Sequence, residues 1–235
     1  MSHRRPMLAL TLVAALAVAT VSACTPSNST SPSPSPEATA PPSPEPASSL
    51  PTALFLGDSY TAGTGLTADQ LPSRWPTRVS EAMGWQEANF GCNGSGYTAR
   101  GQRCGNSYVT RIPLLEDLDP EFVFVSGGVN DFLSGEEEVT AAIDQTFTDL
   151  RAAFPDAQMF AVGSIFYTGD ERPEPLQRLN DAVESAAASV DAEYADIGEP
   201  LLGRPDLMAP DGLHPNPEGH AVIADLTLEA FNLQP

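Results

Sequence analysis

The sequence predicts one α/β domain, in which helices cover both faces of a mainly parallel β-sheet. Three observations support this fold class. Apolar runs of strand length recur along residues 52–235, they alternate with longer segments of helical periodicity, and no internal repeat is found. Strands that are joined through helices pair in parallel. We therefore expect a functional site at the carboxyl ends of the strands, where open α/β sheets bind their ligands.

The first half of this region predicts three strands and one helix. Residues 52–56 are an apolar run with turn residues on both sides, which is typical of a buried strand. Residues 74–84 predict a short helix that ends at a glycine. Residues 87–90 predict a short second strand. Residues 121–126 predict a third strand, because β-branched and aromatic side chains fill them.

The second half predicts three helices and two further strands. Residues 136–154 have apolar side chains at helical spacing, and a proline follows them. Residues 158–163 predict a buried strand, and residues 175–190 an amphipathic helix. Residues 194–197 predict a last short strand. Residues 217–231 predict a closing helix, which begins with Pro-Glu-Gly.

The segment before the domain has the pattern of an export signal. Residues 1–23 combine two arginines with an apolar stretch too short for a comfortable membrane span. The sequence Val-Ser-Ala-Cys that ends at Cys24 resembles a bacterial lipobox, so we expect lipidation of Cys24. Ordinary cleavage nearby, which would leave a free thiol, is the alternative. The arginine pair leaves both general and twin-arginine export open.

Residues 24–51 predict a disordered tether between this lipidated cysteine and the domain of residues 52–235. The tether is rich in proline and serine and has too few apolar residues to form a core. Together the two segments predict an exported protein, anchored by lipid to the outer face of the bacterial cell membrane.

The charge of the chain excludes two classes of partner. The formal net charge is −20, and all basic residues are arginines. Such a surface disfavours binding to nucleic acid and to anionic lipid headgroups. We expect the lipid anchor to make the only membrane contact, and the protein to be a monomer.

Four stretches after predicted strands carry polar or glycine residues suited to chemistry. Ser59 follows the first strand, Gly94 lies in a glycine-rich loop after the second, and Asn130 follows the third. Asp211 precedes His214 by three residues on a predicted turn, where its carboxylate can fix the imidazole tautomer. Each stretch alone is equally compatible with an ordinary turn or helix cap.

Taken together, these stretches resemble the blocks of the SGNH (GDSL-type) hydrolases. The blocks occur here in the order of that family, as Gly57-Asp58-Ser59, Gly94, Gly128-Val129-Asn130-Asp131 and Asp211-Gly212-Leu213-His214. The resemblance implies a flavodoxin-like three-layer α/β/α sandwich with a parallel central sheet. It also implies a serine hydrolase that cleaves carboxylic esters through an acyl-enzyme intermediate, on lipid or on cell-envelope carbohydrate.

The same resemblance implies a role for each residue. Ser59 is the nucleophile, His214 the general base, and Asp211 the residue that orients His214. The oxyanion hole consists of the Ser59 and Gly94 N–H groups and the Asn130 side-chain amide. Gly96 lies close enough in the sequence to replace Gly94 as the backbone donor. His220 is the other histidine of the domain, and we interpret it as neutral and structural.

Other readings of the same residues remain to be distinguished. Asp211, His214, Glu218 and His220 could be ligands of a metal ion, but they lie within one short, proline-containing stretch, so we expect no metal and no cofactor. A non-catalytic, envelope-binding lipoprotein with this fold is the alternative function. The natural substrate is not evident, and Tyr60, Phe132, Leu133 and Tyr167 are candidates for the pocket walls.

The cysteine count predicts one disulfide. If Cys24 is lipidated, Cys92 and Cys104 are the two cysteines left in an exported chain, where oxidation is favoured. Their loop would contain Gly94, so the disulfide would also stabilise the predicted oxyanion hole.

Overall fold

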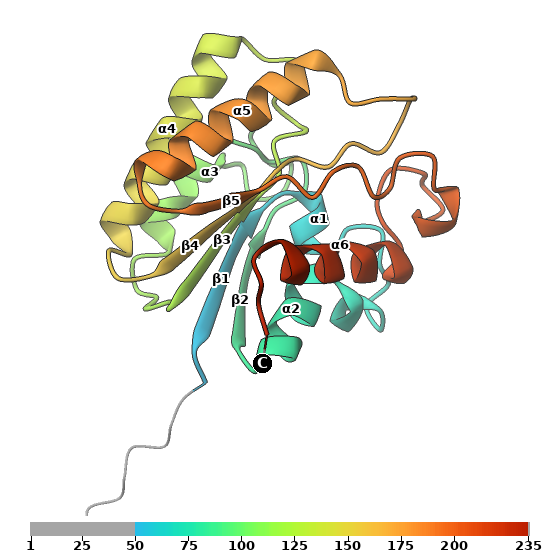
Figure 1. Ribbon diagram of the computed structural model, residues 1–235, viewed down its shortest axis with the longest axis horizontal. Coiled ribbons are helices and arrows are strands. Elements are labelled where there is room, and N and C mark those ends of the chain that lie inside the picture. Colours follow the sequence, from blue (N-terminus) through green and yellow to red (C-terminus); the bar gives the residue numbers. More distant parts are fainter. Residues whose placement is uncertain (1–49, 235) are drawn as a thin grey trace, which may run out of the picture. The chain divides into compact units, whose positions relative to one another are not determined.

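The computed structural model describes residues 50–234 (Figure 1). The predicted signal peptide, the lipidation of Cys24 and nearly all of the predicted tether lie outside these residues. No helix among residues 50–234 is both long and apolar enough to cross a membrane.

A five-stranded parallel sheet forms the centre of the domain. Its strands lie in the order β2-β1-β3-β4-β5, and every neighbouring pair is parallel. Their bounds are Thr52–Gly57 (β1), Gln86–Gly91 (β2), Phe122–Ser126 (β3), Gln158–Val162 (β4) and Glu193–Ala195 (β5). This is the flavodoxin-like order, in which the chain changes direction across the sheet between β1 and β3. The predicted fold class is confirmed.

Helices cover the two faces of the sheet, as Figure 1 shows. The α-helices are Ser59–Ala62 (α1), Trp75–Met83 (α2), Tyr108–Arg111 (α3), Glu136–Ala153 (α4), Glu174–Ser189 (α5) and Pro217–Ala230 (α6). Single 3-10 turns span Leu71–Ser73, Ile112–Leu114 and Pro205–Leu207. The helices α2 and α6 pack together beneath one face, and α4 and α5 pack together on the other.

Each face of the sheet builds its own apolar core. On the side of α2 and α6, the rings of Phe55, Phe124 and Phe160 stack from β1 to β4, with centroids 4.8 and 4.6 Å apart. On the opposite side, apolar residues of β1 and β3 pack against α4 and α5. Because both faces are covered, β1 and β3 are apolar at nearly every position, and this is why they could be predicted as buried strands.

The carboxyl ends of β1, β2 and β3 bring three of the predicted blocks to one edge of the sheet. Ser59 follows β1, Gly94 lies in the loop after β2, and Asn130 follows β3. The turn that carries His214 precedes α6. The topology therefore places the candidate residues around the crevice between β1 and β3.

Candidate active site

The backbone at Ser59 is set by the buried Asp58. Asp58 caps the short helix α1, and its carboxylate accepts a hydrogen bond from the Tyr60 N–H at 2.9 Å. Burial raises the pKa of Asp58 to about 7, and the nearby Asp131 adds to the effect. Asp58 therefore has a structural role beneath the serine. Ser59 is itself nearly buried, with 7% of its surface exposed.

Asp211 and His214 form the predicted pair. One carboxylate oxygen of Asp211 lies 2.8 Å from His214 Nδ1, and the other accepts the N–H groups of Leu213 and His214. Partial burial disfavours the charged form of Asp211, but the hydrogen bonds from the ring and backbone of His214 outweigh it and lower the pKa of Asp211 to about 2. An ionised Asp211 fixes the proton on Nδ1 and leaves Nε2 as the free acceptor.

Tyr60 connects this pair to the serine. Its hydroxyl donates to the Leu213 carbonyl at 2.9 Å, and its ring lies edge-on to the His214 ring, with centroids 6.1 Å apart. Tyr60 directly follows Ser59, so this contact fixes the histidine turn against the serine loop.

Ser59 and His214 line one cleft of about 350 Å³. Within the described residues the two side chains are not hydrogen-bonded to each other. Catalytic contacts of this kind often tighten only when substrate binds. The arrangement thus places a serine hydroxyl and an oriented imidazole on the same cavity.

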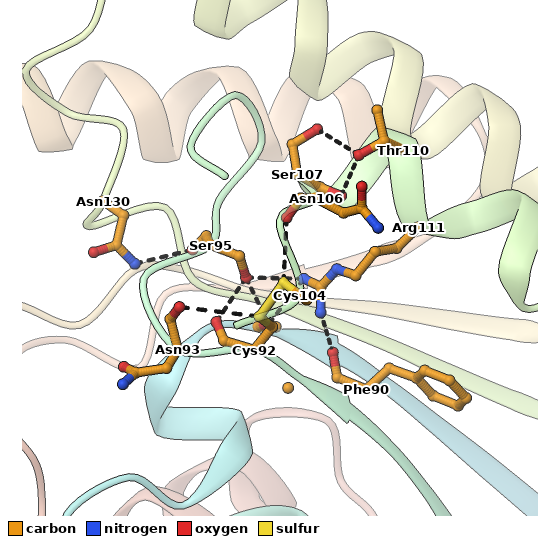
Figure 2. The surroundings of a disulfide bond; sticks show 12 residues. Phe90, Cys92, Asn93, Ser95, Cys104, Asn106, Ser107, Thr110, Arg111 and Asn130 are labelled. Atoms are coloured by element: carbon orange, nitrogen blue, oxygen red, sulfur yellow. Dashed lines mark hydrogen bonds between the residues drawn. A yellow bond between two sulfur atoms is a disulfide. The ribbon is translucent and has the colours of Figure 1, made fainter. Parts of the chain in front are cut away.

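Two backbone N–H donors and one side-chain amide lie beside Ser59 and His214 in this cleft. Among residues 50–234, neither Ser59 N–H nor Gly94 N–H has a hydrogen-bond acceptor in the protein. Gly94 and Asn130 line the same cleft as Ser59. The Asn130 amide donates one hydrogen to the Ser95 carbonyl at 2.9 Å, which leaves its second hydrogen for a ligand (Figure 2).

Gly94 and Gly96 differ in whether the backbone N–H is free to bind a ligand. The Gly96 N–H donates to the Ala99 carbonyl at 2.9 Å, and an added Cβ at Gly96 would collide with the Asp131 carboxylate. Gly96 is thus required for close packing, whereas the N–H of Gly94 is available. Gly94 also has a φ of 72°, which suits glycine.

Asp131 holds the loop that contains these glycines. Its fully buried carboxylate accepts the N–H groups of Tyr97, Thr98 and Ala99 and the hydroxyl of Thr98, at 2.7–3.0 Å. It therefore acts as a structural acceptor. The predicted Cys92–Cys104 disulfide is present and closes the same loop (Figure 2).

His220 lies away from the cleft, in the interior. It is fully buried, and its Nδ1 accepts the Trp75 N–H at 3.3 Å, at the start of α2. Burial, together with the charges of Arg78 and Arg74, lowers the pKa of His220 to about 3. The histidine is thus neutral and structural near pH 7. Among residues 50–234, no three His, Cys, Asp or Glu side chains are placed to share a metal ion.

The walls of the cleft are neutral and partly aromatic. Tyr60, Phe132 and Tyr167 line it, whereas Leu133, the fourth candidate, is 84% exposed and does not. The sequence analysis missed Phe166, Thr168 and Gln102, which also line the cleft. No single pattern marks them, because they lie in loops that meet only in the folded chain.

Comparisons with known proteins match the chain to one family of hydrolases. The model of the GDSL-like Lipase/Acylhydrolase family matches residues 55–222. The chain is 28% identical over 180 residues to the GDSL lipase Rv0518 of Mycobacterium tuberculosis, covering 72% of this chain and 77% of that protein. It is 28% identical over 202 residues to thioesterase 1/protease 1/lysophospholipase L1 of Escherichia coli, covering 80% and 86%.

Solved structures share the fold. The carbohydrate acetylesterase Est24 of Sinorhizobium meliloti superposes with a TM-score of 0.60 at 15% identity, over 77% of this chain and 98% of that one. The esterase EstA of Pseudoalteromonas gives a TM-score of 0.58 at 21% identity, over 77% and 96%. Since the family model covers well over half of the sequence, the chain belongs to the GDSL-like Lipase/Acylhydrolase family and is a carboxylic ester hydrolase.

Proposed function

We propose that this hydrolase cleaves uncharged esters through an acyl-enzyme formed on Ser59. The observation that supports it best is the convergence on one cleft of Ser59, the Asp211–His214 pair and a set of free hydrogen-bond donors. Membership of an esterase family favours this function over the non-catalytic binding protein considered from the sequence.

The first half of the reaction forms the acyl-enzyme. His214 Nε2 takes the proton of the Ser59 hydroxyl as Oγ attacks the ester carbonyl carbon. The carbonyl oxygen becomes an oxyanion, which the Ser59 and Gly94 N–H groups and the Asn130 amide stabilise. When the carbon–oxygen bond breaks, His214 gives its proton to the departing alcohol, and the acyl group stays on Ser59.

The second half repeats these steps with water. His214 removes a proton from water, whose oxygen attacks the acyl carbon, and the oxyanion forms in the same hole. Collapse of the intermediate returns the proton to Ser59 Oγ and releases the carboxylic acid. Asp211 stays ionised throughout and stabilises the imidazolium that forms twice in each cycle.

The lining of the cleft is the basis for the substrate class. Among the described residues, its lining contains no arginine, aspartate or glutamate side chain. Amides of Asn93 and Gln102 and the aromatic walls suit a neutral alcohol such as a sugar, and the volume of about 350 Å³ is at the small end of ligand pockets. We propose short acyl groups, such as acetyl, on neutral carbohydrate or lipid of the cell envelope.

An ester panel tests this proposal. Short-chain p-nitrophenyl esters and acetylated sugars should give a higher kcat/KM than long-chain p-nitrophenyl esters and acyl-CoA, whose phosphates find no cation in the cleft. Ser59→Ala should remove activity toward all of them. A clear preference for acyl-CoA would contradict the substrate class, and full activity of Ser59→Ala would contradict the mechanism.

We further propose that the enzyme is exported and anchored through a lipid on Cys24. Support comes from the lipobox-like sequence and the proline-rich tether that follows it. Stable anchoring needs more than one acyl chain, as a lipidated N-terminal cysteine provides. Cys24→Ala should release the protein from the membrane fraction, and a variant that stays fully bound would contradict this proposal.

A further inference from the structure

Arg111 is a buried cation behind the active site, and the reaction described above does not use it. It ends the short helix α3, and only 5% of its surface is exposed. Within residues 50–234 no carboxylate lies within 4.0 Å of it. Burying a guanidinium without an ion-pair partner is costly, so the atoms that it does contact are informative.

All hydrogen-bond acceptors of Arg111 are neutral oxygens at the edge of the sheet that carries the site. One terminal nitrogen, Nη1, donates to the Phe90 carbonyl in β2. The other, Nη2, donates at 3.0 Å both to the Gly57 carbonyl at the end of β1 and to the Ser95 hydroxyl. Figure 2 shows the guanidinium pointing toward Phe90 and Ser95. One side chain thus joins two strands and one loop.

Each of the three oxyanion donors is linked to a residue that Arg111 contacts, either through the chain within two residues or through one hydrogen bond. Ser59 lies two residues after Gly57, and Gly94 directly precedes Ser95. The Asn130 amide donates to the Ser95 carbonyl at 2.9 Å. Ser95 itself is fully buried, and its hydroxyl donates a hydrogen bond to the Cys92 carbonyl at 2.7 Å. The guanidinium of Arg111 is planar and its N–H groups point in fixed directions, so it is suited to hold the end of β1, strand β2 and the Ser95 loop at set distances from one another.

We propose that Arg111 is a positioning residue for the oxyanion hole: its guanidinium fixes Gly57 and Ser95, so that the donors of Ser59, Gly94 and Asn130 converge on one point. This inference rests on the oxyanion hole of the proposed function. Arg111 does not touch the substrate. Its effect is on the geometry of groups that act mainly in the transition state, where small misplacements are costly.

The test compares Arg111→Met, Arg111→Lys and a matched control, Arg151→Met. Arg151 also donates mainly to backbone carbonyls, among them those of Val190 and Ala157, but it lies at the end of α4, beside the amino end of β4. Kinetics with p-nitrophenyl acetate are normalised to folded enzyme by circular dichroism. Arg111→Met should lower kcat on the order of 10²-fold with little change in KM. Arg111→Lys should recover part of the loss, and Arg151→Met should keep kcat.

A double-mutant cycle with Asn130→Ala separates positioning from mere stability. If Arg111 acts through the same hole, Arg111→Met should lower kcat by a smaller factor in the Asn130→Ala background than in the wild type, because one of the three donors that it positions is already absent. Arg151→Met should leave kcat unchanged in both backgrounds. Unchanged kcat in folded Arg111→Met and Arg111→Lys, or full additivity with Asn130→Ala, would overturn the positioning role. If Arg111→Met does not fold, the loss of kcat is compared in the same two backgrounds with Arg111→Lys instead.

The two proposals fail in different ways. Asn130→Ala with wild-type kcat would contradict the oxyanion hole, and with it the positioning role. A large loss in Asn130→Ala together with wild-type kcat in the Arg111 variants would overturn the positioning role and leave the proposed function intact.

Discussion

Removing the Cys92–Cys104 disulfide should destabilise the domain more than it reduces activity. The two cysteines are 12 residues apart, so the bond closes a loop that is short but contains Gly94 and Ser95. Loop-closure entropy for about 13 residues corresponds to about 3 kcal/mol of stability. For a domain of this size, 1 kcal/mol shifts the melting temperature by about 2–4 °C, so we expect a fall of roughly 6–12 °C.

Activity should fall less, because other contacts hold the same loop. The Asp131 carboxylate fixes residues 97–99, and the Arg111 guanidinium fixes Ser95. Both remain when the disulfide is removed. We therefore expect kcat of the folded enzyme to drop by less than about tenfold, well below the loss of a whole oxyanion donor.

The assay uses Cys92→Ala/Cys104→Ala beside the wild type, each with and without a phosphine reductant. Melting is followed by circular dichroism and kcat with p-nitrophenyl acetate. The double variant serves as its own control, because the reductant should not change it further. An unchanged melting temperature, or complete loss of activity in folded enzyme, would refute the reasoning about how this loop is held.

Three further predictions follow from individual side chains. His214→Ala should lose activity by several orders of magnitude, whereas His220→Ala should mainly lower the melting temperature; the reverse result in steady-state kinetics would exchange their roles. Burial lowers the pKa of His220 to about 3, whereas an unfolded histidine titrates near 6.5, so between these values the unfolded chain binds a proton that the folded chain does not. The free energy of unfolding should therefore decrease as the pH is lowered from 6.5 to 3, and less steeply in His220→Gln; equal slopes in urea titrations would contradict this. Asp131→Ala leaves the buried N–H of Tyr97 and the partly buried N–H groups of Thr98 and Ala99 without their acceptor. It should cost on the order of 3 kcal/mol, measured by urea unfolding, with a wild-type midpoint as the contrary result.

The sequence predicted the long elements well because burial imposes a pattern on them. Each of the five strands was found within two residues of its predicted bounds, and so were the helices α2, α4, α5 and α6. The helices α1 and α3 were missed. Each has only four residues, which is too few to show helical periodicity. The last strand, Glu193–Ala195, begins one residue earlier and ends two residues earlier than predicted, since the segment after it forms a loop.

The candidate site could be predicted as far as local motifs reach. Ser59, Asn130 and the Asp211–His214 pair each belong to a short motif. The choice between Gly94 and Gly96 could not be made from the sequence, because Asp131 and Ala99 contact Gly96 only in the folded chain. Arg111 was missed for a similar reason. It stands alone in its segment, and its partners Gly57, Phe90 and Ser95 come from three other parts of the sequence.

The central claim, that Ser59 is the nucleophile of this esterase, is tested most directly by locating a covalent adduct. The full chain is treated with a fluorophosphonate, digested, and analysed by mass spectrometry, with Asp211→Asn and His214→Ala as slower-reacting controls. We expect a single adduct on Ser59, formed in parallel with the loss of p-nitrophenyl acetate hydrolysis. An adduct on another residue, or complete inhibition with Ser59 unmodified, would contradict the account.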